Sequence, residues 1–395
     1  MLKMYTVVAI IYFITVSLVD ANVPRTGVTV SGVSSGAAMA NQLHIAFSND
    51  ISGAGVLAGP PYYCAGGLLS AAACMSGPVT SISVSGITKK IKAFESSGLI
   101  DSTTNIVNDP VYIFSGKYDP VALPGMVKLN EKVYASLNAN MKTNYDLPAT
   151  HAVPTEHYGG KCAIPNLSTY INNCNFSLAY DVLNHLLGGD LIKPPYLPLT
   201  PRIGQLVVFN QEAFMNPPSS LSSKNPNTDA SFAQWIWKNM VLYNPRNWGS
   251  STSGISNWTI PSTTISMNKR SLLTRANPAY GFDSEGFVYF PSACAQGRKC
   301  PIHVALHGCK QGKHYVGDIF VTQSGYLEVA ELNNVIILLP QVRPSLLSPI
   351  NPMGCWDWFG CTSKDFANKF GPQMIGVKRM IETVQKLNDA IVSSV

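Results

Sequence analysis

The sequence contains few charged residues and no long basic run. Only 13% of its 395 residues are Asp, Glu, Lys or Arg, while 46% are hydrophobic. This composition supplies material for a large core and is not typical of disordered proteins. The net charge of +6 is spread along the chain, and no stretch alternates aromatic with basic residues. We therefore expect no nucleic acid partner, because tracking a phosphate backbone requires clustered Lys and Arg.

The sequence also lacks an apolar run long enough to cross a bilayer, which takes ~20 residues. An apolar stretch at residues 7–16 follows Lys3 and precedes small residues at Val19 and Ala21. This layout is typical of a cleavable secretory signal. We expect residues 1–21 to be a signal peptide and the mature chain to be secreted without stable membrane insertion. The lumen of an endomembrane compartment, such as a lysosome, is the alternative location.

No pair of CxxC motifs with zinc-site spacing is present, so we expect no metal site, and nothing in the sequence points to a cofactor. The chain does contain nine cysteines, which in a secreted protein indicate disulfides. Short spacings suggest three pairs: Cys64 with Cys74, Cys162 with Cys174, and Cys294 with Cys300. Glycosylation sequons occur at Asn166, Asn175 and Asn257.

Short apolar runs alternate with helical patterns, which predicts an α/β fold with a mostly parallel sheet covered by helices on both faces. The expected strands lie at residues 26–30, 53–58, 110–115, 205–210, 286–290, 302–306 and 335–339. An amphipathic helix is expected from the spacing of Met374, Val377, Ile381 and Val384. We expect a single domain at residues 22–395 with an insertion at about 215–280, where the sequence is rich in Ser, Asn and Trp.

A Gly-Val-Ser-Ser-Gly run at residues 32–36 follows the first expected strand, and apolar residues at helical spacing follow it. A strand, a tight Gly-x-Ser-x-Gly turn and a helix form the nucleophile elbow of α/β-hydrolases, which exposes a serine to substrate. A serine hydroxyl needs a histidine base and a carboxylate that orients the imidazole. This context makes Ser34 the expected nucleophile.

The acid and the base should follow the serine in that order. Asp119 follows the carboxyl end of an expected strand, whereas Asp109 precedes the same strand and would lie at the opposite edge, so Asp119 is favoured. His151 and His157 lie downstream in a loop, and spacing alone does not separate them. The histidines His44, His185 and His303 fall within expected helices or strands, where packed or surface roles are more common.

The chain also needs two N–H groups for an oxyanion hole. One is the amide of Ser35, the residue after the nucleophile, and a His-Gly-Cys run at residues 307–309 resembles the loop that supplies the second in lipases. That loop normally precedes the elbow. Because too few residues precede Ser34 for the missing strands, we expect a circular permutation in which the C-terminal part supplies them.

These motifs resemble extracellular poly(3-hydroxybutyrate) depolymerases with a circularly permuted α/β-hydrolase catalytic domain. The resemblance rests on Val-Ser-Gly-Val-Ser-Ser-Gly at residues 30–36, Gln-Leu-His at 42–44 and Gly-Pro-Pro-Tyr-Tyr-Cys at 59–64. It continues in Leu-His-Gly-Cys-Lys-Gln at 306–311 and Asn-Pro-Met-Gly-Cys-Trp-Asp-Trp at 351–358. It covers nearly the whole mature chain outside residues 215–280.

The resemblance implies roles for several residues. His151 fits the family's histidine, which precedes an apolar-Pro-Thr segment, so the implied triad is Ser34, Asp119 and His151. The amides of Ser35 and Cys309 would form the oxyanion hole, and Cys309 would pair with Cys355. Trp358, and Trp356 on the same face of an extended segment, would contact the substrate.

The chain departs from the family pattern at three positions. Ala38 stands where the family usually has an aromatic residue, so one wall of the acyl pocket would differ. Phe359 and Cys361 stand where the family tends to have Trp and Tyr, and Cys361 is the expected unpaired cysteine.

The sequence therefore predicts a secreted serine esterase that cleaves poly(3-hydroxybutyrate) or related polyesters through an acyl-enzyme. A carboxylesterase acting on another ester, such as an acylated polysaccharide or a small lipid, is the alternative. A binding or storage protein that has lost activity is disfavoured, because a decayed site would be expected to lack at least one of the triad residues or the His-Gly-Cys run.

Overall fold

The computed structural model describes residues 27–67, 70–196, 199–217, 235, 238–243 and 281–393. The expected signal peptide and most of the expected insertion lie outside the described residues. The predictions of a signal peptide at residues 1–21 and of an insertion at about 215–280 are therefore not tested by the structure.

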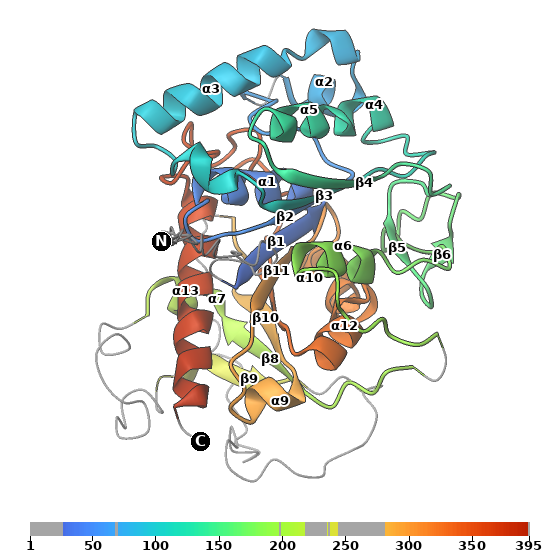
Figure 1. Ribbon diagram of the computed structural model, residues 1–395, viewed down its shortest axis with the longest axis vertical. Coiled ribbons are helices and arrows are strands. Elements are labelled where there is room, and N and C mark those ends of the chain that lie inside the picture. Colours follow the sequence, from blue (N-terminus) through green and yellow to red (C-terminus); the bar gives the residue numbers. More distant parts are fainter. Residues whose placement is uncertain are drawn as a thin grey trace, which may run out of the picture.

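The chain forms one large sheet, one small sheet and helices that surround the large one (Figure 1). The strands are β1 (Val28–Val33), β2 (Ala54–Leu57), β3 (Pro110–Phe114), β4 (Asn140–Asn144), β5 (Val153–Thr155), β6 (Gly160–Lys161), β7 (Ile171–Asn173), β8 (Gln205–Asn210), β9 (Met240–Leu242), β10 (Glu285–Phe290), β11 (Ile302–Leu306) and β12 (Ile336–Leu339). The helices are α1 (Ser35–Ala46), α2 (Ala71–Ser76), α3 (Val84–Ser96), α4 (Pro124–Val127), α5 (Leu129–Ala135), α6 (Leu178–Leu186), α7 (Gln211–Met215), α9 (Ser292–Ala295), α10 (Lys313–Val316), α11 (Ile319–Gln323), α12 (Tyr326–Asn333) and α13 (Pro372–Val392).

The large sheet has nine strands in the order β4-β3-β2-β1-β11-β12-β10-β8-β9. Neighbouring strands from β4 to β12 are parallel, whereas β10 is antiparallel to both β12 and β8. In parallel strands every carboxyl end lies at the same edge of the sheet, and in open α/β sheets this edge carries the functional loops. The loops after β1, β3 and β11 therefore meet there.

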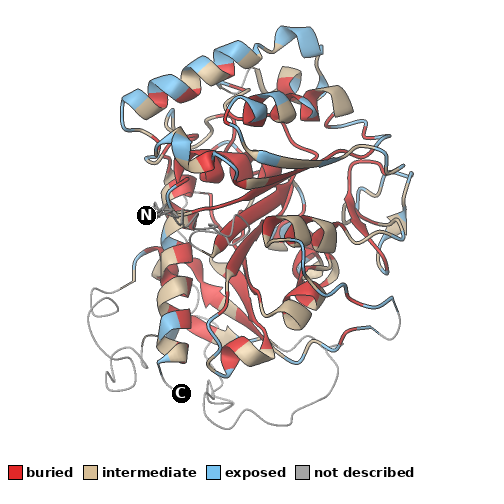
Figure 2. Cartoon of the chain, in the orientation of Figure 1, coloured by how far each residue is buried: buried red, intermediate tan, exposed pale blue. Residues whose placement is uncertain are grey.

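The strands are buried on both faces because their apolar side chains alternate between two cores (Figure 2). Val30, Val304 and Leu338 lie in the first core, which includes side chains of α1, α3 and α13. Ala305 and Leu339 lie in the second core, which includes side chains of α6, α11 and α12. The α/β fold with helices on both faces of a mostly parallel sheet is confirmed.

The position of β1 agrees with the expectation drawn from the displaced His-Gly-Cys loop. β1 lies between β2 and β11 in the sheet interior, and Gly32 pairs with Leu306, directly before that loop. A strand from the first tenth of the chain is therefore flanked on one side by a strand from its last quarter. The circular permutation that would explain this order stays a prediction.

Four disulfides connect the cysteine pairs predicted above. Three close short loops: Cys64–Cys74, Cys162–Cys174 and Cys294–Cys300. The fourth joins Cys309 to Cys355 and so ties the loop after β11 to the segment that carries Trp356 and Trp358. Cys361 is the free cysteine among the described residues, as expected.

Candidate active site

The turn between β1 and α1 holds Ser34 in a strained backbone conformation. Ser34 has φ of 58° and ψ of −119°, a region that residues other than glycine rarely occupy. Its N–H donates to the carbonyl of Leu57 at 2.9 Å, which fastens the turn to the end of β2. Because Ser35 is the first residue of α1, its own N–H has no acceptor within the helix. The turn therefore has the geometry of a nucleophile elbow.

Two glycines flank Ser34 because the backbone approaches too closely for a side chain. A Cβ on Gly32 would lie 2.3 Å from the carbonyl oxygen of Gly36. A Cβ on Gly36 would lie 2.4 Å from the carbonyl oxygen of Leu306 and 2.6 Å from that of His307. The second contact brings the elbow directly against the end of β11 and the loop that follows it.

Asp119 and His151 form a buried pair in two loops at the same sheet edge. The Nδ1–H of His151 donates to Oδ2 of Asp119 at 2.7 Å. The other oxygen, Oδ1, accepts the N–H groups of Val121 and Ala122 at 2.8 and 2.9 Å, which fixes the carboxylate. In the neutral tautomer that carries its proton on Nδ1, Nε2 of His151 is the nitrogen that can accept a proton, as a general base requires.

The competing histidine and acid lie elsewhere. His157 is exposed, its ring contacts Tyr196, and it lines a different cavity from the one that contains Ser34. Asp109 precedes β3 and contacts Nε2 of His44 at 3.2 Å, so it serves packing at the opposite end of the strand. His151, which contacts Asp119, thus lies in the same cavity as Ser34, whereas His157 and Asp109 do not line that cavity. The triad of Ser34, Asp119 and His151 stays a prediction.

The loop after β11, residues 307–311, lies against Ser34. A Cβ on Gly308 would be 3.3 Å from Cβ of Ser34. The carbonyl of Gly308 accepts Nδ1–H of His307 at 2.7 Å, while Nε2 of His307 accepts the N–H of Val342 at 3.2 Å. Burial lowers the pKa of His307 to about 4, so the ring is neutral and its tautomer is set by these two bonds.

The peptide that follows Gly308 is the expected second oxyanion donor. The Gly308–Cys309 bond is not one of the cis peptides, and in a trans peptide the N–H points opposite to the C=O. Because the carbonyl of Gly308 is held by His307, the N–H of Cys309 is held pointing the other way. Cys309 lines the same cavity as Ser34, and its role as oxyanion donor stays a prediction.

Ser34, His151 and Cys309 line one cavity of about 610 Å³. Its walls are mainly apolar and come from segments far apart in the sequence; they include Met75, Val121, Leu167, Ile350, Met353 and Trp358. A cavity of this size with a few convergent polar groups is the usual form of a small-molecule or enzyme site. The space beside Ser34 is therefore bounded mainly by apolar side chains.

The two tryptophans expected to contact substrate have different positions. Trp358 lines the cavity, and its ring meets Phe359 edge to face at 5.6 Å. Trp356 is fully buried, packs against Phe282 and His307, and is not part of the cavity wall. The expectation for Trp356 was wrong because residues 352–353 form a turn and residues 357–362 form bends, so the segment is not an extended strand in which residues two apart share a face.

Sequence patterns did not identify Tyr170 and Gln311 as part of the site. Both line the cavity, and the ring of Tyr170 meets that of His151 edge to face at 6.4 Å. Tyr170 has a positive φ of 53°, a conformation that the sequence around it does not predict. Their positions depend on contacts between loops distant in the sequence.

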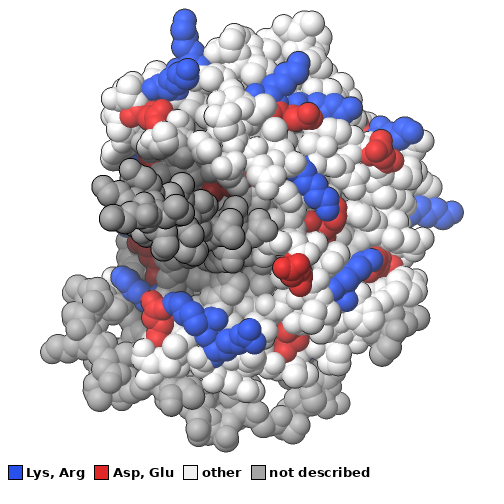
Figure 3. Space-filling model, in the orientation of Figure 1, with Lys and Arg blue, Asp and Glu red and all other residues white. Residues whose placement is uncertain are grey.

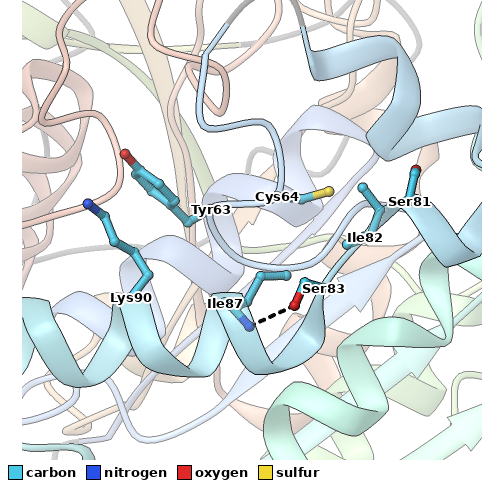
Figure 4. A pocket seen from close by; sticks show the side chains of 8 residues that line it. Tyr63, Cys64, Ser81, Ile82, Ser83, Ile87 and Lys90 are labelled. Atoms are coloured by element: carbon cyan, nitrogen blue, oxygen red, sulfur yellow. Dashed lines mark hydrogen bonds between the residues drawn. The ribbon is translucent and has the colours of Figure 1, made fainter.

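A second cavity beside α3 has no catalytic groups. It measures about 310 Å³ and lies between the loop after β2 and the start of α3, with Tyr63 and Lys90 at one end (Figure 4). Ser83 lines it, but its hydroxyl accepts the N–H of Gly86 and so caps the helix. The Nζ of Lys90 lies 4.9 Å from the centre of the Tyr63 ring. The cavity with Ser34 is therefore the candidate site.

The surface gives no sign of a polyanion site on the face shown in Figure 3, where basic and acidic side chains are interspersed. Within the described ranges, no helix has the length and apolar character needed to cross a membrane. Across the same residues, no cluster of three or more His, Cys, Asp or Glu side chains is arranged to hold a metal ion.

Comparison with known proteins finds similar sequences and structures. No protein-family model matches the chain. A poly(3-hydroxybutyrate) depolymerase from Delftia acidovorans is 32% identical over 377 residues, which cover 93% of the chain and 62% of that relative. A polyhydroxybutyrate depolymerase from Talaromyces funiculosus is 28% identical over 379 residues, 92% of the chain and 91% of the relative. The chain therefore spans less than two thirds of the length of the bacterial relative and nearly all of the fungal one.

Solved structures agree. A PHB depolymerase from Penicillium funiculosum superposes with a TM-score of 0.66 at 26% identity, over 93% of the chain and 98% of that structure. A serine-to-alanine variant of a PHB depolymerase in complex with an R3HB trimer has the same TM-score at 27% identity, over 94% and 98%. The chain is a homologue of the poly(3-hydroxybutyrate) depolymerases. It shares the α/β-hydrolase fold of these homologues.

Proposed function

We propose that the protein is a secreted serine hydrolase that cleaves ester bonds of poly(3-hydroxybutyrate) or related polyesters through an acyl-enzyme. The observation that carries the proposal is the shared cavity. One apolar space of about 610 Å³ contains the strained Ser34 and the Asp119-bound His151, in a chain homologous to PHB depolymerases.

In this mechanism the Oγ of Ser34 attacks the ester carbonyl carbon while Nε2 of His151 takes the hydroxyl proton. Asp119, held by the N–H groups of Val121 and Ala122, stabilises the imidazolium that forms. The carbonyl oxygen becomes an oxyanion, which accepts hydrogen bonds from the N–H groups of Ser35 and Cys309. Collapse of this intermediate breaks the ester C–O bond, and His151 returns the proton to the departing alkoxide.

Deacylation repeats the sequence with water. His151 takes a proton from the water, whose oxygen attacks the acyl carbon on Ser34, and the same two N–H groups stabilise the second oxyanion. The proton then passes to Oγ of Ser34, and a 3-hydroxyacid leaves. These steps need no cofactor or metal, because His151 carries out each proton transfer and backbone amides stabilise the negative charge.

The proposal extends to the organisation of the chain. Residues 1–21 are a signal peptide and residues 22–395 a single catalytic domain with an insertion at about 215–280. A single sheet that combines β1 with β11 and β12 supports one domain and a circular permutation. The four disulfides support a secreted or lumenal location, since disulfides persist in oxidising compartments.

A carboxylesterase for another ester remains the second candidate, and one observation favours keeping it. Ala38 packs in a small cluster with Trp358 and Phe359 where the resemblance leads us to expect an aromatic residue. Ala38 does not line the cavity itself, but Trp358 and Phe359 do, and a small side chain in their cluster would leave these rings room to admit other acyl groups.

Substrate comparison separates the two candidates. Purified protein is given an R-3-hydroxybutyrate trimer, tributyrin and acetylated xylan, and kcat/KM is measured for each soluble ester. We expect the trimer to have the highest kcat/KM. The Ser34→Ala variant should lose activity on all three esters. A higher kcat/KM on tributyrin or acetylated xylan than on the trimer would favour the carboxylesterase.

A further inference from the structure

Gln311 is buried in the wall of the cavity, yet its amide faces the backbone of the protein. The residue is 1% exposed, and its side-chain amide forms three hydrogen bonds, each to a backbone group. Its Oε1 accepts the N–H of Gly308 at 2.9 Å. Its Nε2 donates to the carbonyls of Thr169 and Tyr170 at 3.0 and 3.2 Å. One side chain therefore joins two loops that are about 140 residues apart in the sequence.

On the first loop, Gln311 acts on the expected oxyanion donors. By accepting the N–H of Gly308, it removes that group from the donors that could face substrate. The main-chain N–H of Gln311 donates to the carbonyl of Gly308 at 3.2 Å, and this carbonyl also accepts the bond from His307. Two donors thus hold this carbonyl, and planarity of the peptide transfers its orientation to the N–H of Cys309.

On the second loop, Gln311 reaches the segment that carries the general base. The carbonyl of Tyr170 accepts both Nε2 of Gln311 and the N–H of Val153 at 2.8 Å. Val153 begins β5, two residues after His151. The backbone at Tyr170 has a positive φ of 53°, which costs ~1 kcal/mol or more for a residue with a side chain. The bonds from Gln311 to the carbonyls on either side help to hold that conformation.

We propose that Gln311 is a positioning residue that sets the oxyanion donor Cys309 and the base His151 at the correct mutual distance. It touches neither the reacting serine nor the ester in this account and acts through the two backbone segments. The inference rests on the proposed function. Its physical basis is that a misplacement of about 1 Å between reacting groups can cost about 100-fold in rate, and loss of one oxyanion donor costs about 100- to 1000-fold.

The chain contains a matched control. Gln211 is also fully buried, donates through Nε2 to the carbonyls of Asp283 and Gln341, and accepts the N–H of Gln341 through Oε1. It makes the same three kinds of bond to backbone, but it is not among the residues that line the cavity with Ser34. Replacement of either glutamine should cost similar folding stability, so a difference in turnover isolates the positioning role.

The experiment compares Gln311→Met with Gln211→Met on a soluble ester, with thermal unfolding of each variant measured in parallel. We expect both variants to lose comparable stability, whereas kcat falls about 10- to 100-fold in Gln311→Met only, with KM within about 3-fold of wild type. Equal kcat in the two folded variants would overturn the proposal and leave Gln311 a purely structural residue.

A second variant keeps the proposal testable if Gln311→Met does not fold. In Gln311→Glu an ionised carboxylate still accepts the N–H of Gly308 but faces two carbonyl oxygens without a donor. Protonation restores one donor, so the ratio of variant to wild-type kcat should rise as pH falls from 8 to 5.5, and the corresponding ratio for Gln211→Glu should not. A flat ratio for Gln311→Glu would contradict the proposal.

These outcomes are distinct from failure of the proposed function. If wild type hydrolyses the ester and Ser34→Ala does not, the proposed function stands whatever the glutamine variants do. If wild type hydrolyses none of the esters, the proposed function fails and the inference about Gln311 fails with it.

Discussion

At the scale of single residues, the account depends on which histidine is the base. His151 contacts Asp119 at 2.7 Å and lines the cavity with Ser34, whereas His157 lines another cavity. We expect His151→Ala to lower kcat by about 1000-fold or more, as removal of a triad member does in serine hydrolases. His157→Ala should keep kcat within about 3-fold of wild type, since surface substitutions perturb little. Steady-state kinetics on a p-nitrophenyl ester measure both, and the reverse pattern would make His157 the base.

Trp358 is the residue that would distinguish a polymer substrate from a short one. Its ring forms part of the apolar wall, where a polyester chain could lie beyond the reacting ester. Binding energy from remote parts of a substrate contributes to rate only if the substrate reaches them. We expect Trp358→Ala to reduce the rate on polymer films at least about 10-fold more than on p-nitrophenyl butyrate. Equal losses on both would indicate a general folding or pocket role.

At the scale of secondary structure elements, the elbow depends on the close approach of β1, α1 and the end of β11. A Cβ on Gly36 would lie 2.4 and 2.6 Å from two backbone oxygens. Relieving these clashes would require the backbone at the end of β11 to move. We expect Gly36→Ala to destabilise the protein by more than ~3 kcal/mol or to prevent folding. Gly98→Ala serves as the control, because Gly98 has open space around it and only a positive φ of 68°, which costs ~1 kcal/mol. Urea unfolding compares the two, and similar midpoints would contradict this explanation of the elbow.

The elements that could be predicted from sequence are those with a strong apolar run. β8 and β11 begin and end where the pattern placed them, and α13 includes the expected amphipathic stretch. β4 was missed because it is a partly exposed strand at the sheet edge with the polar sequence Asn-Met-Lys-Thr-Asn, which leaves no alternation to detect. The small sheet of β5, β6 and β7 was missed because its strands have only two or three residues.

The candidate site shows the same division between local and tertiary information. Ser34 and Gly36 could be identified because the elbow is encoded in five consecutive residues. Tyr170 and Gln311 could not, because their roles arise only when the loop before β7 meets the loop after β11. Trp356 was misplaced because the expected extended backbone is replaced by bends, which sequence patterns do not predict.

At the scale of the whole molecule, two buried neutral histidines make stability depend on pH. Burial lowers the pKa of His303 to about 3 and that of His307 to about 4. In the unfolded chain both would titrate near pH 6.5. Because the unfolded state then binds more protons, their contribution to stability is complete above about pH 6.5 and is lost as pH falls toward the folded pKa values.

We therefore expect the free energy of unfolding to fall by about 2–5 kcal/mol between pH 8 and pH 4.5. Chemical unfolding at fixed temperature across this range measures it. Calorimetry at pH 5.5 in two buffers of different ionisation enthalpy should also detect proton uptake on unfolding. A stability that is constant from pH 8 to pH 5 would show that these histidines do not stay neutral in the folded protein.

The most direct test of the whole account is the release of soluble 3-hydroxybutyrate from poly(3-hydroxybutyrate) granules by the purified, disulfide-intact protein. The account predicts that wild type releases monomer or short oligomers, and that Ser34→Ala, with an unchanged unfolding temperature, releases at least about 1000-fold less. Release by Ser34→Ala at the wild-type rate, or no release by folded wild type, would contradict it.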